Sequence, residues 1–268
     1  QDRKGDFGYQ LSGNVTYLQN EVTNLNGEVI INDFSIDRRG PLNITQEGAP
    51  INQYYLFQSD GYFQNQAEID AHPSQGPDTR PGFIRFKDIN DDGVIDNEDR
   101  VATGNVIPEF TYTFNINFSY KNWSLNSFWQ GVEGVDTYNK HVSGVPFWFG
   151  TGVPTDWAND SWTPENPDAS LPILMRYQDG VSTQFRDSDF WLLDASYLRL
   201  KKLQLRYDFG SRVLDALGLQ ELVLYANAQN LLTITDLEDF DPETRLLGGN
   251  FFNYPSARTY TFGVNVTF

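Results

Sequence analysis

The chain has 268 residues, and its 19 basic and 36 acidic residues give a formal net charge of −17. A surface this acidic repels nucleic acid, and the absence of cysteine excludes disulfides, thiolate nucleophiles and zinc–thiolate sites. No run approaches the roughly 18 apolar residues that a membrane-spanning helix needs, so any crossing of a bilayer is expected to use strands.

Alternating apolar and polar residues predict the strands. Residues 7–17 place Phe7, Tyr9 and Leu11 on one face and Gln10 and Ser12 on the other. Further strands are predicted, in chain order, at 110–120, 123–130 after a tight turn at Lys121-Asn122, 198–209, 222–231 and 260–268. Strands of about ten residues with aromatic residues near their ends are typical of transmembrane barrels. A soluble β-sandwich shows the same alternation and is the alternative.

The polar faces favour the membrane barrel. In the three most regular strands (7–17, 110–120 and 260–268), these faces carry Asn, Thr, Ser, Gln and Gly but no Lys, Arg, Asp or Glu. A soluble surface normally carries about a quarter charged residues, whereas neutral polar groups suit a water-filled lumen. We therefore predict an all-β fold, a transmembrane antiparallel β-barrel segment.

Long irregular stretches separate the strands, at about 20–108, 131–195 and 233–257. Outer-membrane barrels place long loops outside the cell and short turns in the periplasm, so the Lys121-Asn122 turn is expected to be periplasmic. Loops this long are usually functional. They are rich in Gly, Pro, Asn and Asp, and we expect the segment that contains residues 88–99 to be polar and without a core of its own.

The strongest local motif is an acidic loop, residues 88–99, whose spacing matches the calcium loop of an EF-hand. The predicted calcium ligands are Asp88, Asn90, Asp92, the Val94 carbonyl, Asp96 through water, and Asp99. Gly93 permits the sharp turn. The last position is Asp where EF-hands carry a bidentate Glu, which leaves the coordination number open. The alternative is an acidic loop of Asx-turns without metal.

The loop around 145–167 is rich in aromatic residues. Exposed rings of Trp148, Trp157 and Trp162 could stack on a sugar or peptide substrate or contact a partner, and packing within the loop is the alternative. Enzyme chemistry has little support, because the chain has two histidines and no Gly-x-Ser-x-Gly, Walker or His-Glu-x-x-His motif. We predict that the chain is not an enzyme.

The end of the chain, Tyr254–Phe268, resembles the closing strand of SusC/RagA-type TonB-dependent outer-membrane transporters. Further stretches resemble that family in the same order: Gly82–Asn105, Phe110–Gly131 ending in Trp129-Gln130-Gly131, Asp194–Leu205, Ala226–Thr233 and Asp239–Glu243. Because the chain begins at Gln1 without an apolar leader, we interpret it as a piece of a longer protein, with residues 1–268 forming the C-terminal portion of the barrel.

The resemblance implies a 22-stranded barrel in the outer membrane of a Gram-negative bacterium. It implies an importer of large nutrients, glycans or peptides, with a SusD-like surface lipoprotein as a lid. No plug domain or TonB-contacting segment is recognisable in this chain, so contact with TonB is expected through an N-terminal region absent here. Other expected partners are the rest of the barrel and outer-membrane lipid. The alternative function is a secreted calcium-dependent carbohydrate-binding β-protein.

Overall fold

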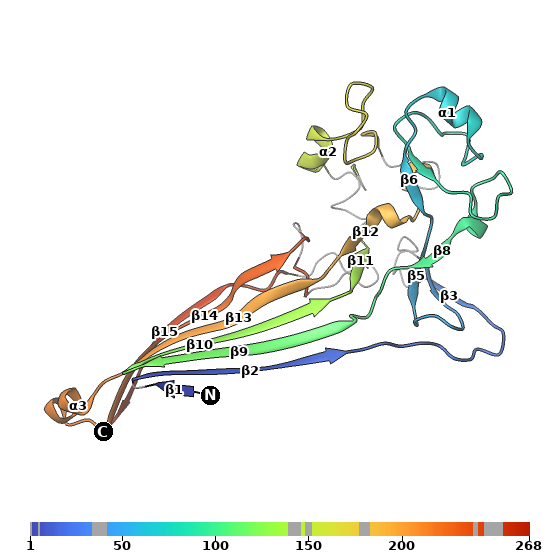
Figure 1. Ribbon diagram of the computed structural model, residues 1–268. Helices are drawn as coiled ribbons and strands as arrows, with labels where there is room; N and C mark the ends of the chain where they lie inside the picture. Colours follow the sequence, from blue (N-terminus) through green and yellow to red (C-terminus); the bar gives the residue numbers. More distant parts are fainter. Residues whose placement is uncertain are drawn as a thin grey trace.

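The computed structural model describes residues 2–4, 6–33, 42–138, 146–147, 152–176, 183–237, 241–243 and 254–268. Figure 1 shows two parts: a long, curved sheet, and a layer of loops and short strands at one end of it. The predicted all-β class is confirmed, because antiparallel strands dominate and the helices are short.

The long sheet has seven strands in the order β1-β2-β9-β10-β13-β14-β15, and neighbouring strands are antiparallel. Their bounds are β1 (Asp2–Lys4), β2 (Phe7–Tyr17), β9 (Phe110–Tyr120), β10 (Trp123–Glu133), β13 (Tyr197–Asp208), β14 (Glu221–Thr235) and β15 (Thr259–Thr267). All six predicted strands are confirmed, and β10 and β14 extend several residues beyond the prediction. The register pairs Leu11 with Ile116, so the apolar residues of neighbouring strands share a face.

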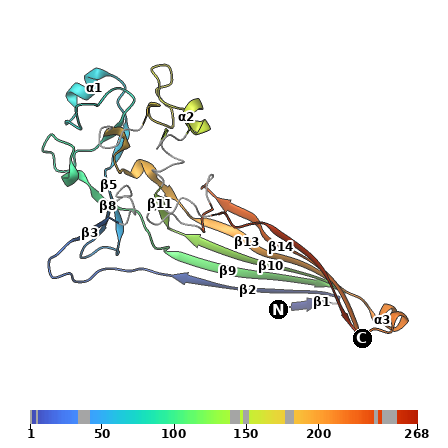
Figure 2. The same ribbon diagram turned by 180° about the vertical axis from the view of Figure 1, so that it is seen from behind.

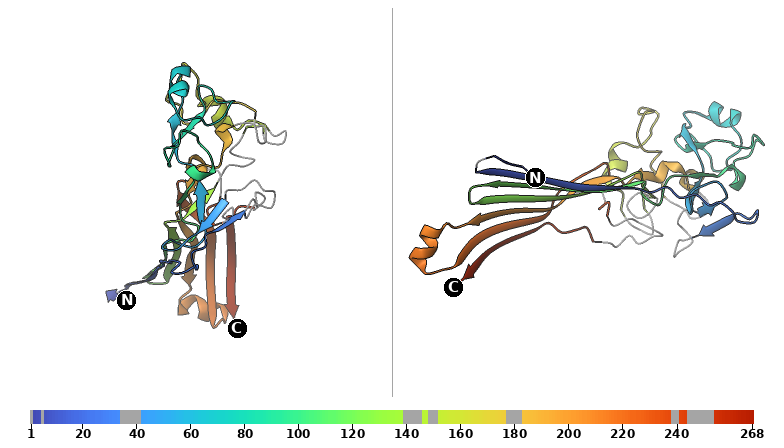
Figure 3. Two further views of the ribbon diagram at one scale, coloured as in Figure 1. Left: turned by 90° about the vertical axis from the view of Figure 1, so that its right-hand side faces the viewer. Right: turned by 60° about the horizontal axis from the view of Figure 1, so that its bottom comes forward.

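The sheet is open. Its outermost strands are β1 and β15, and no pairing joins them within the described residues. The seven described strands therefore do not close into a barrel among themselves, which agrees with the expectation that the chain forms only a portion of one. Figure 3 shows the curvature of the sheet and its two separate long edges.

The sheet connections differ at its two ends. The β9–β10 turn is tight, and Lys121 adopts a left-handed backbone conformation there, with φ of 51°. At the same end, helix α3 (Ser211–Leu217) joins β13 to β14 and ends at Gly218, whose φ of 67° gives the usual left-handed helix terminus. Figure 2 shows α3 at the end of the sheet opposite the loop layer. Among the described residues, no helix is long and apolar enough to span a membrane.

The loop layer has secondary structure that the sequence patterns did not reveal. A four-stranded sheet has the order β3-β4-β5-β8, and the pairs β6-β7 and β11-β12 form separate ribbons. The strands are β3 (Ile30–Asp33), β4 (Leu42–Thr45), β5 (Gln53–Leu56), β6 (Ser59–Tyr62), β7 (Ile84–Phe86), β8 (Val101–Thr103), β11 (Asp136–Tyr138) and β12 (Leu192–Asp194). The helices are α1 (Gln66–Ala71), α2 (Thr155–Asn159) and the 3₁₀ turns η1 (Asn97–Asp99), η3 (Thr183–Phe185) and η4 (Asp189–Trp191).

The expectation that the segment of the acidic loop lacks a core is wrong, because Ile95 belongs to a hydrophobic cluster. One hydrophobic cluster joins β5, β7, α2 and the turns η3 and η4, and its Leu56, Ile84 and Phe86 are fully buried. Such packing occurs because two of the long loops, 20–108 and 131–195, each contribute several apolar residues. The loop layer is therefore a folded unit above the end of the sheet.

Candidate functional site

The outer face of the long sheet is apolar and exposed. Leu11 is 60% exposed, Val15 68% and Phe262 81%, although these are the side chains that a soluble protein would bury. The ring centroids of Tyr17 and Phe110 are 4.9 Å apart, at the end of the sheet nearest the loop layer. An apolar band ending in aromatic residues is typical of a surface that faces lipid.

The opposite face is polar and holds many carboxamides. Asn126 on β10 donates a side-chain hydrogen bond to Asn117 on β9, its cross-strand neighbour. Charge appears on this face mainly along β13, where Arg206 forms an ion pair with Asp208. This face therefore resembles the lining of a water-filled interior, with charged groups added by one strand.

An ion network on the polar face ties the segment after β14 to β13. Arg199 of β13 donates to Asp241 at 2.6 Å and also to Glu243, while Lys201 donates to Glu243 at 2.8 Å. The side chains of Arg199 and Asp241 are each only 4% exposed. Lys201 lies at a β-bulge, where the register with β14 shifts between Leu200 and Lys202. Arg199 and Lys201 both reach the Glu243 carboxylate.

The network also captures the chain just before β15. The backbone N–H of Ser256 donates to Asp241, and the Ser256 hydroxyl donates to Glu243 at 3.2 Å. Burial raises the pKa of Asp241, but hydrogen bonds from Arg199 and from the N–H groups of Ser256 and Glu243 outweigh burial and lower this pKa to about 2. The sequence analysis missed this site. Its signal was the basic Arg199 and Lys201 together with the acidic Asp241-Pro242-Glu243.

The low pKa of Asp241 makes the attachment of this segment sensitive to acid. A lowered pKa contributes stability above the unfolded value of 3.8, and that contribution is lost as the pH falls through the folded value of about 2. About 2 kcal/mol is expected to disappear between pH 4 and pH 2. A nitroxide label on Tyr254→Cys, in the full-length protein, should therefore become more mobile over this range. If the mobility of the label rose in the same way with falling pH in an Asp241→Asn background, the assignment to Asp241 would be contradicted.

The acidic loop adopts a compact turn closed by its own side chains. Asp88 accepts from the N–H of Gly93 at 2.8 Å, and Asp92 accepts from the N–H of Val94 at 2.8 Å. Gly93 has φ of 86°, as the motif requires. Asp96 caps the 3₁₀ turn η1. The contacts of Asp92 and Asp96 reach two residues along the chain and are Asx-turn contacts, the alternative weighed for this loop, whereas that of Asp88 spans five residues.

Two of the predicted ligands, Asn90 and Asp99, differ in accessibility. Asp99 is fully buried and accepts from the N–H groups of Ile89 and Asp96, at 2.8 and 2.7 Å. Asn90 is exposed and donates to Asp92. In the part of the chain that the structure describes, no three His, Cys, Asp or Glu side chains gather into a group that could hold a metal. One oxygen, Oδ1 of Asp88, is nevertheless buried without a hydrogen-bond partner.

The acidic loop is anchored to the loop core. Ile95, in the middle of the loop, is 1% exposed, and its N–H donates to the Ser74 carbonyl at 2.9 Å. Arg186 donates to the Ile95 carbonyl at 2.7 Å and to the Gln75 carbonyl at 2.8 Å. Burial lowers the pKa of Arg186, and the neighbouring Arg100 lowers it further. The loop thus has a fixed base and an exposed tip.

The aromatic residues predicted to be exposed are placed differently. Trp157 is 3% exposed and stacks on Trp191, with ring centroids 6.4 Å apart. Trp162 is 4% exposed, and its indole N–H donates to Gln64 at 2.9 Å. Trp148 lies outside the described residues. The expectation of exposed rings is therefore corrected for Trp157 and Trp162, because the loop core buries both.

Comparison with known proteins gives a consistent set of relatives. No family model matches the chain. TonB-dependent receptor P26 of Formosa agariphila is 31% identical over 220 residues, 78% of this chain and 22% of the relative. TonB-dependent receptor P3 of the same organism is 29% identical over 84% of this chain and 23% of its own length. TonB-dependent receptor SusC of Bacteroides thetaiotaomicron is 24% identical over 98% of this chain and 25% of its own length.

Solved structures show the same fold. The RagAB peptide transporter matches with a TM-score of 0.72 at 22% identity, over 100% of this chain and 28% of that chain. The RagAB peptide importer in its closed-closed state matches with a TM-score of 0.73 at 20% identity over the same shares. The chain thus spans about a quarter of the length of these relatives, all named as receptors or transporters rather than enzymes. The resemblance stated from the sequence is confirmed.

Proposed function

We propose that this chain, a homologue of SusC-type TonB-dependent receptors over most of its length, forms part of the wall and extracellular mouth of an outer-membrane nutrient importer. The observation that carries the proposal is the sheet itself. Its strands are 9 to 15 residues long apart from β1, and they expose an apolar face on one side and a polar face on the other. Strands of this length, tilted, cross a bilayer.

The arrangement of the loop layer supports the proposal that it forms an extracellular mouth rather than a catalytic site. It is folded, it lies at one end of the sheet, and short connections occupy the other end (Figure 1). Outer-membrane barrels have this asymmetry, with large loops outside the cell. By analogy with the relatives, we propose a SusD-like lipoprotein as the lid, TonB contact through a region outside this chain, and glycans or peptides as substrates. The RagAB proteins, which share the fold, are named as peptide transporters.

Cysteine labelling tests the proposed topology, because this chain has no cysteine of its own. In the full-length protein freed of other cysteines, Asp70→Cys in α1 should react with a membrane-impermeant maleimide on intact cells. Asp215→Cys in α3 should react only after the outer membrane is permeabilised. Leu11→Cys, on the outer face, should react in neither case until detergent is added.

Two results would overturn this topology. Labelling of Asp215→Cys on intact cells would reverse the orientation. Rapid labelling of Leu11→Cys in intact membranes would mean that the outer face meets water, as in the alternative of a secreted carbohydrate-binding β-protein. The label positions are all exposed side chains in short helices or on the sheet surface, so substitution should not disturb folding.

We also propose that the acidic loop binds calcium. The spacing of Asp88, Asn90, Asp92, Val94, Asp96 and Asp99 supports a hard cation, and so does the buried, unpartnered Oδ1 of Asp88. Carboxylates here already accept backbone N–H groups, yet each oxygen keeps a second lone pair for a cation. The core beneath the loop fixes its base, so calcium would order the tip alone.

Calorimetry on the full-length protein tests the calcium proposal. We expect binding with a Kd of about 10⁻⁴ to 10⁻³ M, the range of extracellular calcium modules. The double substitution Asp88→Ala with Asp92→Ala should abolish it, while Asp70→Ala, an exposed carboxylate in α1, should not. An unchanged titration in the double variant would rule out this site.

A further inference from the structure

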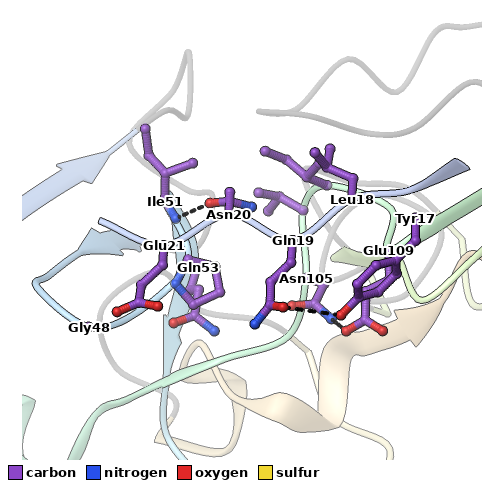
Figure 4. Close-up of a pocket in the computed structure, with 13 residues that line it drawn as sticks. Tyr17, Leu18, Gln19, Asn20, Glu21, Gly48, Ile51, Gln53, Asn105 and Glu109 are labelled. Atoms are coloured by element: carbon purple, nitrogen blue, oxygen red, sulfur yellow. Dashed lines mark hydrogen bonds between the residues drawn. The ribbon is translucent and has the colours of Figure 1, made fainter. Parts of the chain in front are cut away.

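A cavity of about 170 Å³ lies where the long sheet meets the loop layer (Figure 4). Three segments that are distant in sequence form it: residues 17–21 after β2, residues 48–53 before and within β5, and residues 105–109 before β9. It lies apart from the ion network and from the acidic loop.

Backbone contacts build the cavity from these segments. The N–H of Leu18 donates to the Glu109 carbonyl at 2.8 Å, and the N–H of Ile51 donates to the Asn20 side chain at 2.8 Å. The N–H of Asn105 donates to Asp136 at 2.7 Å, which fixes the third segment. These hydrogen bonds, two of which are accepted by side chains, hold the three segments of the cavity together.

The cavity opens on the outer side of the wall. Tyr17 belongs to the outer face, where its ring contacts that of Phe110. Its hydroxyl donates to the Gln19 side chain at 3.3 Å, so Gln19 lies on the same side. Figure 4 shows Glu21 and Glu109 pointing to this side as well, whereas Leu18 and Ile51 point the other way. The polar lining thus begins directly beyond the last aromatic pair of the apolar band.

The lining is acidic and rich in carboxamides. Glu21 and Glu109 supply two carboxylates, and none of the lining residues is Lys, Arg or His. Gln19, Gln53 and Asn105 stand between the two carboxylates in Figure 4. Asn105 donates to Glu109 at 3.0 Å, which holds that carboxylate at the cavity. Such a site repels anions and suits a compact group with several N–H donors.

We propose that this cavity binds the primary ammonium headgroup of a lipid in the adjacent leaflet. The proposal rests on the proposed function, since it takes the outer face to contact lipid. Aromatic residues at the end of an apolar band mark the membrane interface, so the cavity lies at the height of the headgroups. A primary ammonium has three donors for the carboxylate and carboxamide oxygens. Any phosphate of the same headgroup would stay in water at the rim.

Native mass spectrometry of the full-length transporter tests this inference. The protein is released from nanodiscs of equal phosphatidylethanolamine and phosphatidylcholine, which differ only in the three methyl groups on nitrogen. We expect retained phosphatidylethanolamine to exceed phosphatidylcholine by roughly threefold to tenfold, as two partly exposed ion contacts would give. The double variant Glu21→Gln with Glu109→Gln should lose the preference, because its amides carry no charge. Its backbone contacts remain, so it should fold.

The matched control is Glu28→Gln, an exposed carboxylate just before β3 and outside the cavity lining, which should keep the preference. An unchanged preference in the double variant would overturn the inference. Displacement of the lipid by free ethanolamine or glucosamine at millimolar concentration would also overturn it, by identifying a site for soluble amines. Substrate uptake should persist in the double variant, so loss of lipid preference is distinguishable from failure of the proposed transport function.

Discussion

Replacing Arg199 with methionine is expected to release residues 241–243 and the residues just before β15 from β13. The substitution leaves Asp241 and Glu243 without their main cation in a site where Arg199 and Asp241 are each 4% exposed. Removing one partner of a buried ion pair costs about 3–5 kcal/mol, because the remaining charge is uncompensated. Trypsin cleavage after Arg258, next to the captured Ser256, should accelerate on the order of 100-fold or more if opening precedes cleavage.

Two further variants test whether the effect on cleavage is specific to the ion network. Arg206→Met removes an arginine from the same strand, but its ion pair with Asp208 is 43% and 42% exposed, so cleavage should change little. The triple variant Arg199→Met, Asp241→Asn and Glu243→Gln removes all the charges together and should recover most of the resistance. If Arg199→Met alone leaves cleavage unchanged, the network does not hold this segment.

The sheet was predictable because its pattern is local. In β2 and β9, eleven residues alternate strictly, and the register Leu11 with Ile116 follows from matching the apolar faces. The last residues of β10 and β14 were not predicted, because the alternation of apolar and polar residues weakens there. In β14 the bulge opposite Lys201 changes which residues share a face, and a pattern of period two cannot anticipate this change.

The loop layer was not predictable in the same way. Its strands are three or four residues long, too short to show a period. Its core is built from contacts between distant loops, for example Phe57 with Phe86 and Trp157 with Trp191. Only tertiary structure brings these residues together. The sequence therefore indicated exposed polar loops where the chain forms a packed layer.

The candidate sites also differ in whether they could be predicted from sequence. The acidic loop could be found from sequence because its ligands lie within twelve residues of one another. The ion network joins Arg199 to Asp241, 42 residues away, and the cavity joins Glu21 to Glu109. Neither has a spacing that identifies it. Long-range sites of this kind become visible only once the register of the sheet and the positions of the loops are known.

Trp157→Ala is expected to loosen the loop layer while leaving the long sheet intact. Trp157 is buried against Phe185 and Trp191, at the junction of α2 with the turns η3 and η4. Truncation of a buried Trp to Ala costs about 3–5 kcal/mol, because it removes apolar contacts and leaves a cavity. Hydrogen exchange of residues 183–191 in the full-length protein should accelerate on the order of 100-fold to 1000-fold, whereas β9 and β10 should stay protected.

A control substitution distinguishes a folding role of Trp157 from direct contact with a partner. Trp123→Ala removes an indole that is 47% exposed on the outer face of the sheet, far from the loop core, and should leave exchange in 183–191 unchanged. Binding of a lid lipoprotein should weaken in Trp157→Ala only together with the loss of protection, because the ring acts through the packing of the layer. If lid binding or substrate uptake fell while residues 183–191 stayed protected, Trp157 would contact the partner directly, as the sequence first suggested.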